Sequence, residues 1–176
     1  MTRSFRSRDG RYRVVTAGSV IAGMFTLSAR GYPNETGGVV TGYYTSDLRS
    51  AEITSAEPPP RDSMAGPGWF ERGTSGLKPL FRRLWRPASG KRKYYLGEWH
   101  SHPGGGLRPS RTDDAQMLAI ASGPYHCPEP LLIVIGGRSQ SGWGVSVWVY
   151  PNGRRLEMAE ESDHGAGRCL VPGWKV

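Results

Sequence analysis

The sequence predicts a single α/β domain. Its 176 residues are within the usual size of one domain, and a chain of this length can bury a core without disulfide or metal support. Hydrophobic residues make up 37% of the chain and charged residues 22%, which is typical of a globular protein. Segments that alternate like strands are separated by stretches whose apolar residues have helical spacing. Many turns are expected from the 25 glycines and 14 prolines.

The N-terminal part predicts a strand, a helix and a strand pair. Residues 11–17 alternate between apolar and polar side chains, and residues 18–29 space their apolar residues as a partly buried helix does. Residues 37–44 and 50–57 are typical of two strands joined by a polar turn. The chain therefore begins with one α/β unit and continues into a sheet.

An insertion between strands is expected at 58–93. It opens as a loop over 58–68 and continues as an amphipathic helix that carries three arginines, and Pro79 restricts where this helix can begin. The apolar positions assigned to the helix are Phe70, Leu77, Leu80, Phe81, Leu84 and Trp85.

The C-terminal half predicts the rest of the sheet and one more helix. Strands are expected at 94–99, 131–136, 143–150 and 154–158, with a helix at 110–122. We expect the domain to occupy residues 1–160 and the tail, 161–176, to be irregular.

Charge and cysteine content narrow the function classes. The net charge is +8, mostly from arginine, which favours an acidic partner or surface. Because the arginines are scattered and no nucleic-acid motif accompanies them, a solvated basic face is favoured over a nucleic-acid footprint. Cys127 and Cys169 lie far apart, so neither a disulfide framework nor a cysteine zinc site is indicated.

Residues 14–29 superficially imitate a signal peptide. Thr, Ser and Gly interrupt the apolar stretch, and cleavage near Ala29 would remove a strand and a helix that the domain needs. No stretch is apolar for long enough to span a membrane. We therefore expect a cytoplasmic protein.

Two histidines occupy one face of the strand that ends near residue 100. Residues two apart in a strand point to the same side, so His100 and His102 can present both imidazoles to one point. Pro103 then stops the strand, and Gly104-Gly105-Gly106 lets the backbone turn back. A strand built in this way offers two metal ligands.

Asp113 is the candidate for a third ligand. Ser110 and Asp113 open the next helix, and a carboxylate in its first turn can point back toward the histidines. Zinc held by three protein ligands keeps a fourth position for water and is a catalytic arrangement. The same pair is also an ordinary capping box, and taken alone capping is the better explanation. What favours a metal site is the whole conjunction.

That conjunction resembles the JAMM motif of the JAB/MPN metalloprotease family, H-x-H-P followed several residues later by S-x-x-D. Upstream, Glu35-Thr36-Gly37-Gly38 is similar to the E-T-G-G start of prokaryotic JAB domains, and Gly97-Glu98-Trp99 also resembles bacterial members. The resemblance covers roughly residues 11–158. It implies an MPN (JAB) fold, with a central mixed, mostly antiparallel curved β-sheet flanked by helices.

The resemblance also implies a role for each matching residue. His100, His102 and Asp113 would bind one zinc ion, Glu35 would be the general base for a zinc-activated water, and Ser110 would help to stabilise the oxyanion. Glu98 shares the strand face of the histidines, which leaves open whether it supports the site or has a surface or structural position.

The implied activity is cleavage after the C-terminus of a ubiquitin-like or conjugated protein. Bacterial forms resemble deconjugating peptidases encoded beside E1-like and E2-like proteins, some of them in antiphage operons that attach a cyclic-nucleotide synthase to targets. Alternatives are trimming of a sulfur-carrier protein, a non-catalytic MPN scaffold, and nucleic-acid binding through the arginines of the insertion.

Overall fold

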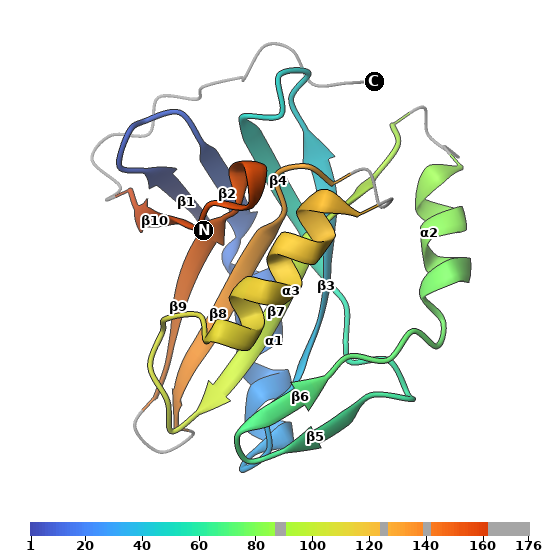
Figure 1. Cartoon of the computed structure of the whole chain (residues 1–176), viewed down its shortest axis with the longest axis vertical. Helices are drawn as coiled ribbons and strands as arrows, with labels where there is room; N and C mark the ends of the chain where they lie inside the picture. Colours follow the sequence, from blue (N-terminus) through green and yellow to red (C-terminus); the bar gives the residue numbers. More distant parts are fainter. Residues whose placement is uncertain (87–90, 124–126, 139–141, 162–176) are drawn as a thin grey trace.

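Eight strands close into a barrel around which the other elements are arranged (Figure 1). The computed structural model describes residues 1–86, 91–123, 127–138 and 142–161. The barrel order is β1-β10-β9-β8-β7-β3-β4-β2. Its strands are β1 (Thr2–Ser7), β2 (Arg13–Ala17), β3 (Gly37–Tyr44), β4 (Ser50–Ala56), β7 (Tyr94–Pro103), β8 (Leu131–Arg138), β9 (Gly142–Val149) and β10 (Leu156–Glu160).

The pairing is mixed and mostly antiparallel, as expected, but the sheet is closed where the sequence predicted a curved sheet. Among the described strands, only the pairs β2–β4 and β7–β8 run parallel. Closure depends on β1, which pairs with both β2 and β10. This strand was not predicted, because Phe5 is its one large apolar side chain and the alternation signal is too weak. Ion pairs such as Arg3 with Glu160 tie it to β10.

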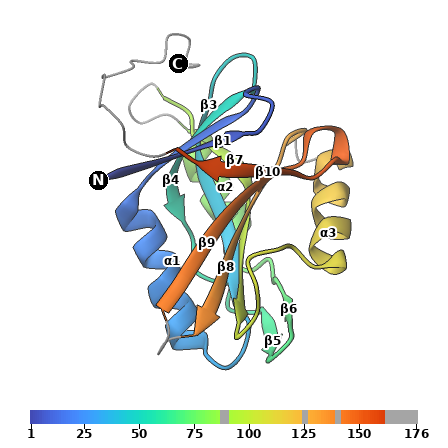
Figure 2. The ribbon, with the colours of Figure 1, turned by 90° about the vertical axis from the view of Figure 1, so that its left-hand side faces the viewer.

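Two helices pack against the barrel from different sides (Figure 2). The helix α1 (Gly18–Gly31) contributes Ile21 and Met24 to the core inside the barrel, which also contains Ile133. On the opposite face of β8, Val134 belongs to a second core with Met117 of α3 (Arg111–Ser122). Side chains of β8 alternate between the two cores, so α3 covers the outer face of β7, β8 and β9.

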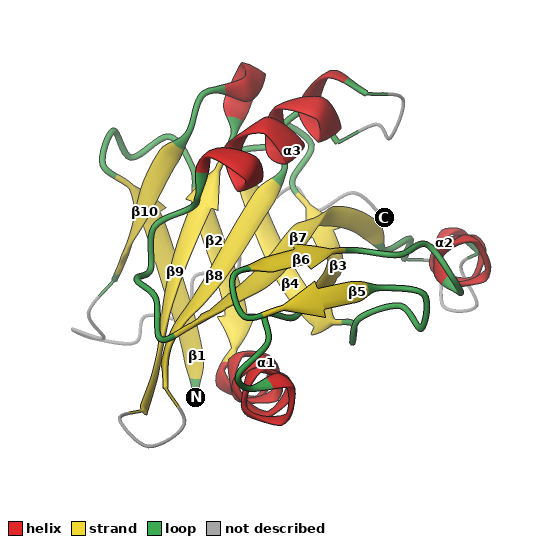
Figure 3. Ribbon diagram, turned by 60° about the horizontal axis from the view of Figure 1, so that its bottom comes forward, coloured by secondary structure: helices red, strands yellow, loops and turns green. Residues whose placement is uncertain are grey.

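The segment between β4 and β7 contains a small hairpin and a third helix. The hairpin strands β5 (Met64–Gly66) and β6 (Trp69–Glu71) form a separate sheet outside the barrel (Figure 3). The loop predicted over 58–68 is confirmed except at 64–66, which form β5, and the helical position of Phe70 is wrong. Three-residue strands are too short to show a period. The helix α2 (Leu77–Trp85) has Pro79 in its first turn, where proline is tolerated.

The other predicted helices and strands are confirmed within a few residues, and a short 3-10 turn, η1 (Pro151–Gly153), precedes β10. The limits of the domain at 1–160 and of the insertion at 58–93 stay predictions. Beyond Glu161, the predicted tail lies outside the described residues. None of the described helices combines the length and the apolar character that crossing a membrane requires.

Candidate metal centre

The two predicted histidines point from β7 toward α3. The parallel register pairs His100 with Val134 and His102 with Gly136, which places both imidazoles on the face that α3 covers. Their side chains are 14% and 13% exposed, and the ring centroids lie 5.0 Å apart. After Pro103, the chain turns at Gly104, whose φ of 72° is in the left-handed region that favours glycine.

Asp113 is presented to both histidines by the start of α3. Ser110 is the N-cap residue: its hydroxyl accepts the backbone N–H of Asp113, and its own N–H donates to Oδ2 of Asp113 at 2.7 Å. The capping box thereby fixes the carboxylate, which lies 2.8 Å from Nδ1 of His100 and 3.3 Å from Nε2 of His102. Capping and site formation are thus combined in one arrangement.

Glu35 reaches the same point from the chain that leads into β3. Its backbone N–H donates to the carbonyl of Gly66, and the next residue, Thr36, is bonded to Ser101 of β7. Oε2 of Glu35 lies 2.9 Å from Nε2 of His100. Side chains from three separate segments therefore meet at the end of β7.

The hairpin β5–β6 forms a wall of this site. The ring of Phe70 contacts the imidazole of His100, with 5.5 Å between centroids. A Cβ atom added to Gly37 would lie 2.9 Å from the Phe70 ring and 2.6 Å from the carbonyl of Trp99. Glycine at this position therefore lets the hairpin pack closely over the histidine.

Glu98 is buried beside the cluster and does not have a surface position. It is 6% exposed, and its carboxylate accepts hydrogen bonds from Arg72 at 2.8 Å, Tyr95 at 3.2 Å and Gln116 at 2.6 Å. Burial raises the pKa of Glu98, and the nearby Arg72 guanidinium opposes that shift. The carboxylate joins the end of the hairpin to β7 and α3, beside the histidines.

The electrostatics of the cluster favour charge separation. Burial alone would lower the pKa of His100, but the carboxylates of Asp113 and Glu35 outweigh it and raise this pKa to about 9. For Asp113, burial acts to raise the pKa, and the two histidines overcome it and hold the pKa well below its usual range. Without metal, the imidazole of His100 and the carboxylate of Asp113 therefore form an ion pair.

The cluster has the donors and the spacing of a metal site. Ligand atoms of Glu35, His100 and His102 all lie within 4.8 Å of one another. Nε2 of His100 is buried and makes no hydrogen bond in the described structure, because its approach to Glu35 is close but poorly aligned. The 3.3 Å between Nε2 of His102 and Oδ2 of Asp113 matches two ligands of a tetrahedral zinc ion, about 3.3 Å apart for bonds of about 2 Å.

All five predicted site residues are thus close together, but their individual roles stay predictions. The structure also adds residues that the sequence did not single out: Ser101, which binds the backbone beside Glu35, and Phe70 and Arg72 from the segment after β4. For these residues the sequence offers one signal. Ser101 lies between the two histidines, so strand alternation places its side chain on the opposite side of β7.

Two histidines on a strand and a carboxylate from the first turn of a helix make up the site. Comparison with known proteins identifies the family to which such a site belongs. The model of the prokaryotic homologs of the JAB domain matches residues 18–150. The chain belongs to this family.

Two curated relatives are similar over most of their length. A CD-NTase/cGAS isopeptidase from Enterobacter hormaechei is 38% identical over 151 residues, which is 85% of this chain and 82% of that protein. A probable metalloprotease, y4qB, from Sinorhizobium fredii is 28% identical over 81% of this chain and 86% of that protein. The solution structure of protein DSY2949 from Desulfitobacterium hafniense has a TM-score of 0.58 at 17% identity, covering 84% of this chain and 88% of that one, which shows the fold alone.

Proposed function

We propose that this protein is a zinc-dependent isopeptidase that cleaves after the C-terminus of a ubiquitin-like or conjugated protein. The observation that carries the proposal is the convergence of Glu35, His100, His102 and Asp113, with a buried imidazole nitrogen that has no hydrogen-bond partner in the described structure. The names of the two relatives, an isopeptidase and a probable metalloprotease, support the same class of reaction.

His100, His102 and Asp113 would hold the metal, and Glu35 is left to act on protons. Zinc bound here would polarise the scissile carbonyl and lower the pKa of water, so that hydroxide is available as the nucleophile at neutral pH. Glu35 accepts the proton that the attacking water loses and delivers it to the leaving amine nitrogen. The hydroxyl of Ser110 accepts one hydrogen bond from Asp113 and still has its hydrogen to donate to the oxyanion.

The hairpin offers a place for an extended tail. Each barrel strand already has two neighbours, whereas β6 pairs only with β5 in the described chain. An extended peptide can add a strand to such an open edge, which would bring its end beside Phe70 and the cluster.

For the substrate, we propose a protein conjugate of a CD-NTase system, encoded with E1-like and E2-like partners, as the name of the Enterobacter relative supports. Trimming of a sulfur-carrier protein is the alternative within the same chemistry. Neighbouring genes distinguish them, since cysteine or thiamine biosynthesis genes would indicate the second.

The test is metal content together with cleavage. Purified protein should hold about one zinc per chain and should cleave a fusion in which the C-terminal tail of a CD-NTase precedes a reporter protein. Chelation with phenanthroline and the variant Glu35→Gln should each stop cleavage. Absence of zinc, or cleavage that survives both treatments, would overturn the proposal.

A further inference from the structure

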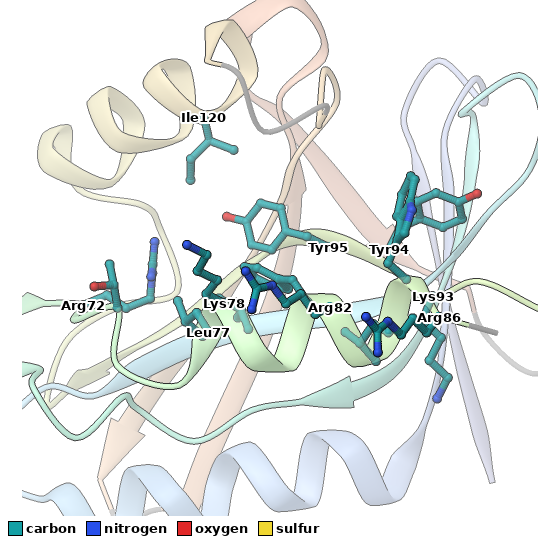
Figure 4. A pocket seen from close by; sticks show the side chains of 14 residues that line it. Arg72, Leu77, Lys78, Arg82, Arg86, Lys93, Tyr94, Tyr95 and Ile120 are labelled. Atoms are coloured by element: carbon teal, nitrogen blue, oxygen red, sulfur yellow. The ribbon is translucent and has the colours of Figure 1, made fainter. Parts of the chain in front are cut away.

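A large groove lies between α2 and the body of the protein. It has a volume of about 760 Å³, which is within the range of ligand-binding cavities. Helix α2 forms one wall, while β7 and α3 supply the other. Figure 4 shows Tyr95 of β7 between Ile120 of α3 and the side chains of α2.

The floor of the groove is apolar and aromatic. It includes Val39 and Ile120, which are buried, and the ring of Tyr95, which packs against Phe81 of α2 with 5.6 Å between centroids. Trp85 of α2 remains 55% exposed at one end. Such a surface can accept apolar side chains from another molecule.

The rim of the groove is cationic. Among the described residues, its lining contains no carboxylate and five basic side chains, which are Arg72, Lys78, Arg82, Arg86 and Lys93. Arg72 is paired with the buried Glu98, but Lys78, Arg82 and Arg86 form no ion pair within the described chain. The net charge of +8 adds to the same field. A molecule that complements this groove in charge is therefore negative.

The groove lies next to the candidate metal centre, with the buried Glu98 between them. Arg72 and Tyr95 line the groove, and both donate to Glu98. Glu98 in turn lines a smaller cavity together with His100 and Asp113. A chain lying in the groove would therefore pass beside residues that hold Glu98 next to the cluster.

We propose that this groove docks an acidic segment with interspersed apolar side chains, carried by the protein substrate of the metal centre. The inference rests on the proposed function, because the position of the groove next to the cluster makes a protein substrate the occupant. Lys78, Arg82 and Arg86 bind the carboxylates, and the floor formed by Phe81 and Tyr95 accepts the apolar side chains. Nucleic acid fits less well, because these two rings pack against each other edge to face.

Fluorescence anisotropy with short labelled peptides tests the groove itself. The first peptide combines Asp and Glu with Leu and Phe. In the second peptide Asn and Gln replace the acids, and in the third peptide Lys replaces them. The acidic peptide should bind best, and the double variant Lys78→Glu/Arg82→Glu should weaken its binding roughly tenfold, because two of the basic partners of its acids are then reversed in charge. Arg83→Glu is the control, because Arg83 is exposed on the same helix but does not line the groove.

The outcomes separate this inference from the proposed function. Equal binding of all three peptides, equal loss in Arg83→Glu, or stronger binding of a single-stranded oligonucleotide would overturn the groove assignment. The double variant should unfold at the same temperature as wild type and hold the same zinc, whereas its KM for the full conjugate should rise. If wild type holds no zinc and cleaves nothing, the proposed function fails, and the peptide titration still reports on the groove.

Discussion

Thr36 and Ser101 are joined by two hydrogen bonds across the β3–β7 boundary. The N–H of Thr36 donates to the hydroxyl of Ser101 at 2.9 Å, and the N–H of Ser101 donates to the carbonyl of Thr36 at 2.7 Å. Ser101 is fully buried, and it lies between the two histidines in the chain. The backbone beside Glu35 is thus fixed directly to the strand that carries His100.

Replacement of this serine should uncouple Glu35 from the histidines. In Ser101→Ala, the buried N–H of Thr36 loses its acceptor, at a cost of about 1–3 kcal/mol in the free energy of unfolding. Urea unfolding measures this cost, and cleavage assays should show a lower kcat with zinc retained. Ser55→Ala is the control, because the hydroxyl of Ser55 bonds to Glu57 away from the cluster. Equal effects of the two substitutions would contradict a positioning role for Ser101.

Metal content distinguishes the third ligand from the base. Asp113→Asn should lower zinc affinity by more than roughly 100-fold, which exceeds the usual effect of losing a group that only orients a ligand. Glu35→Gln should keep one zinc per chain while kcat falls about 10²–10⁴-fold. Competition with a zinc-responsive dye measures both affinities. The reverse result, zinc lost from Glu35→Gln and kept by Asp113→Asn, would assign the ligand role to Glu35, whose carboxylate also lies within ligand distance of the histidines.

Two substitutions separate the capping role of Ser110 from its role in catalysis. Ser110→Ala should cost about 1 kcal/mol of stability, whereas Ser110→Gly should cost only a few tenths, because glycine is tolerated at an N-cap. Both remove the hydroxyl, so both should lower kcat by about 10²–10³ if it donates to the oxyanion. Thermal unfolding and steady-state kinetics give the two readouts. If kcat falls only in proportion to the loss of stability in each variant, Ser110 is a helix cap and does not act in catalysis.

The sequence predicted the parts of the site that depend on local geometry. Alternation placed His100 and His102 on one face, and the helix-start pattern placed Ser110 and Asp113 in the capping box that is observed. Glu35 could be found only through resemblance, because its position is set by long-range pairing of β3 with β7. Local patterns carry no information on such contacts.

The elements that were missed share a physical cause. The strand β1 has a single large apolar residue, Phe5, and is held by distant ion pairs and by pairing with β10. The hairpin β5–β6 is too short for a period, so Phe70 was assigned to a helix although it packs on His100. Tertiary contacts, not local sequence preference, stabilise these segments.

The ion pair in the cluster makes the stability of the metal-free protein depend on pH. In the folded state, burial opposes the charge on His100, but Asp113 and Glu35 raise its pKa to about 9, above the ordinary value of 6.5. A raised pKa contributes stability that is fully present below pH 6.5 and is lost as the pH rises through about 9. Burial raises the pKa of Cys127 from 9.0 to about 12, so this thiol adds a loss of stability only at the upper end of the window, as the pH passes 9.0.

Urea unfolding of the chelated protein at a series of pH values between 6 and 9.5 measures the effect. Stability should fall across this window, and His100→Gln, which cannot be protonated, should remove most of the slope. Zinc should remove it as well, because a histidine that binds metal is already deprotonated. For the same reason zinc affinity should increase with pH over this range, since the metal competes with the proton on His100. A chelated protein whose stability is constant from pH 6 to 9.5, with wild type and His100→Gln superimposed, would show that the carboxylates do not hold a proton on this histidine.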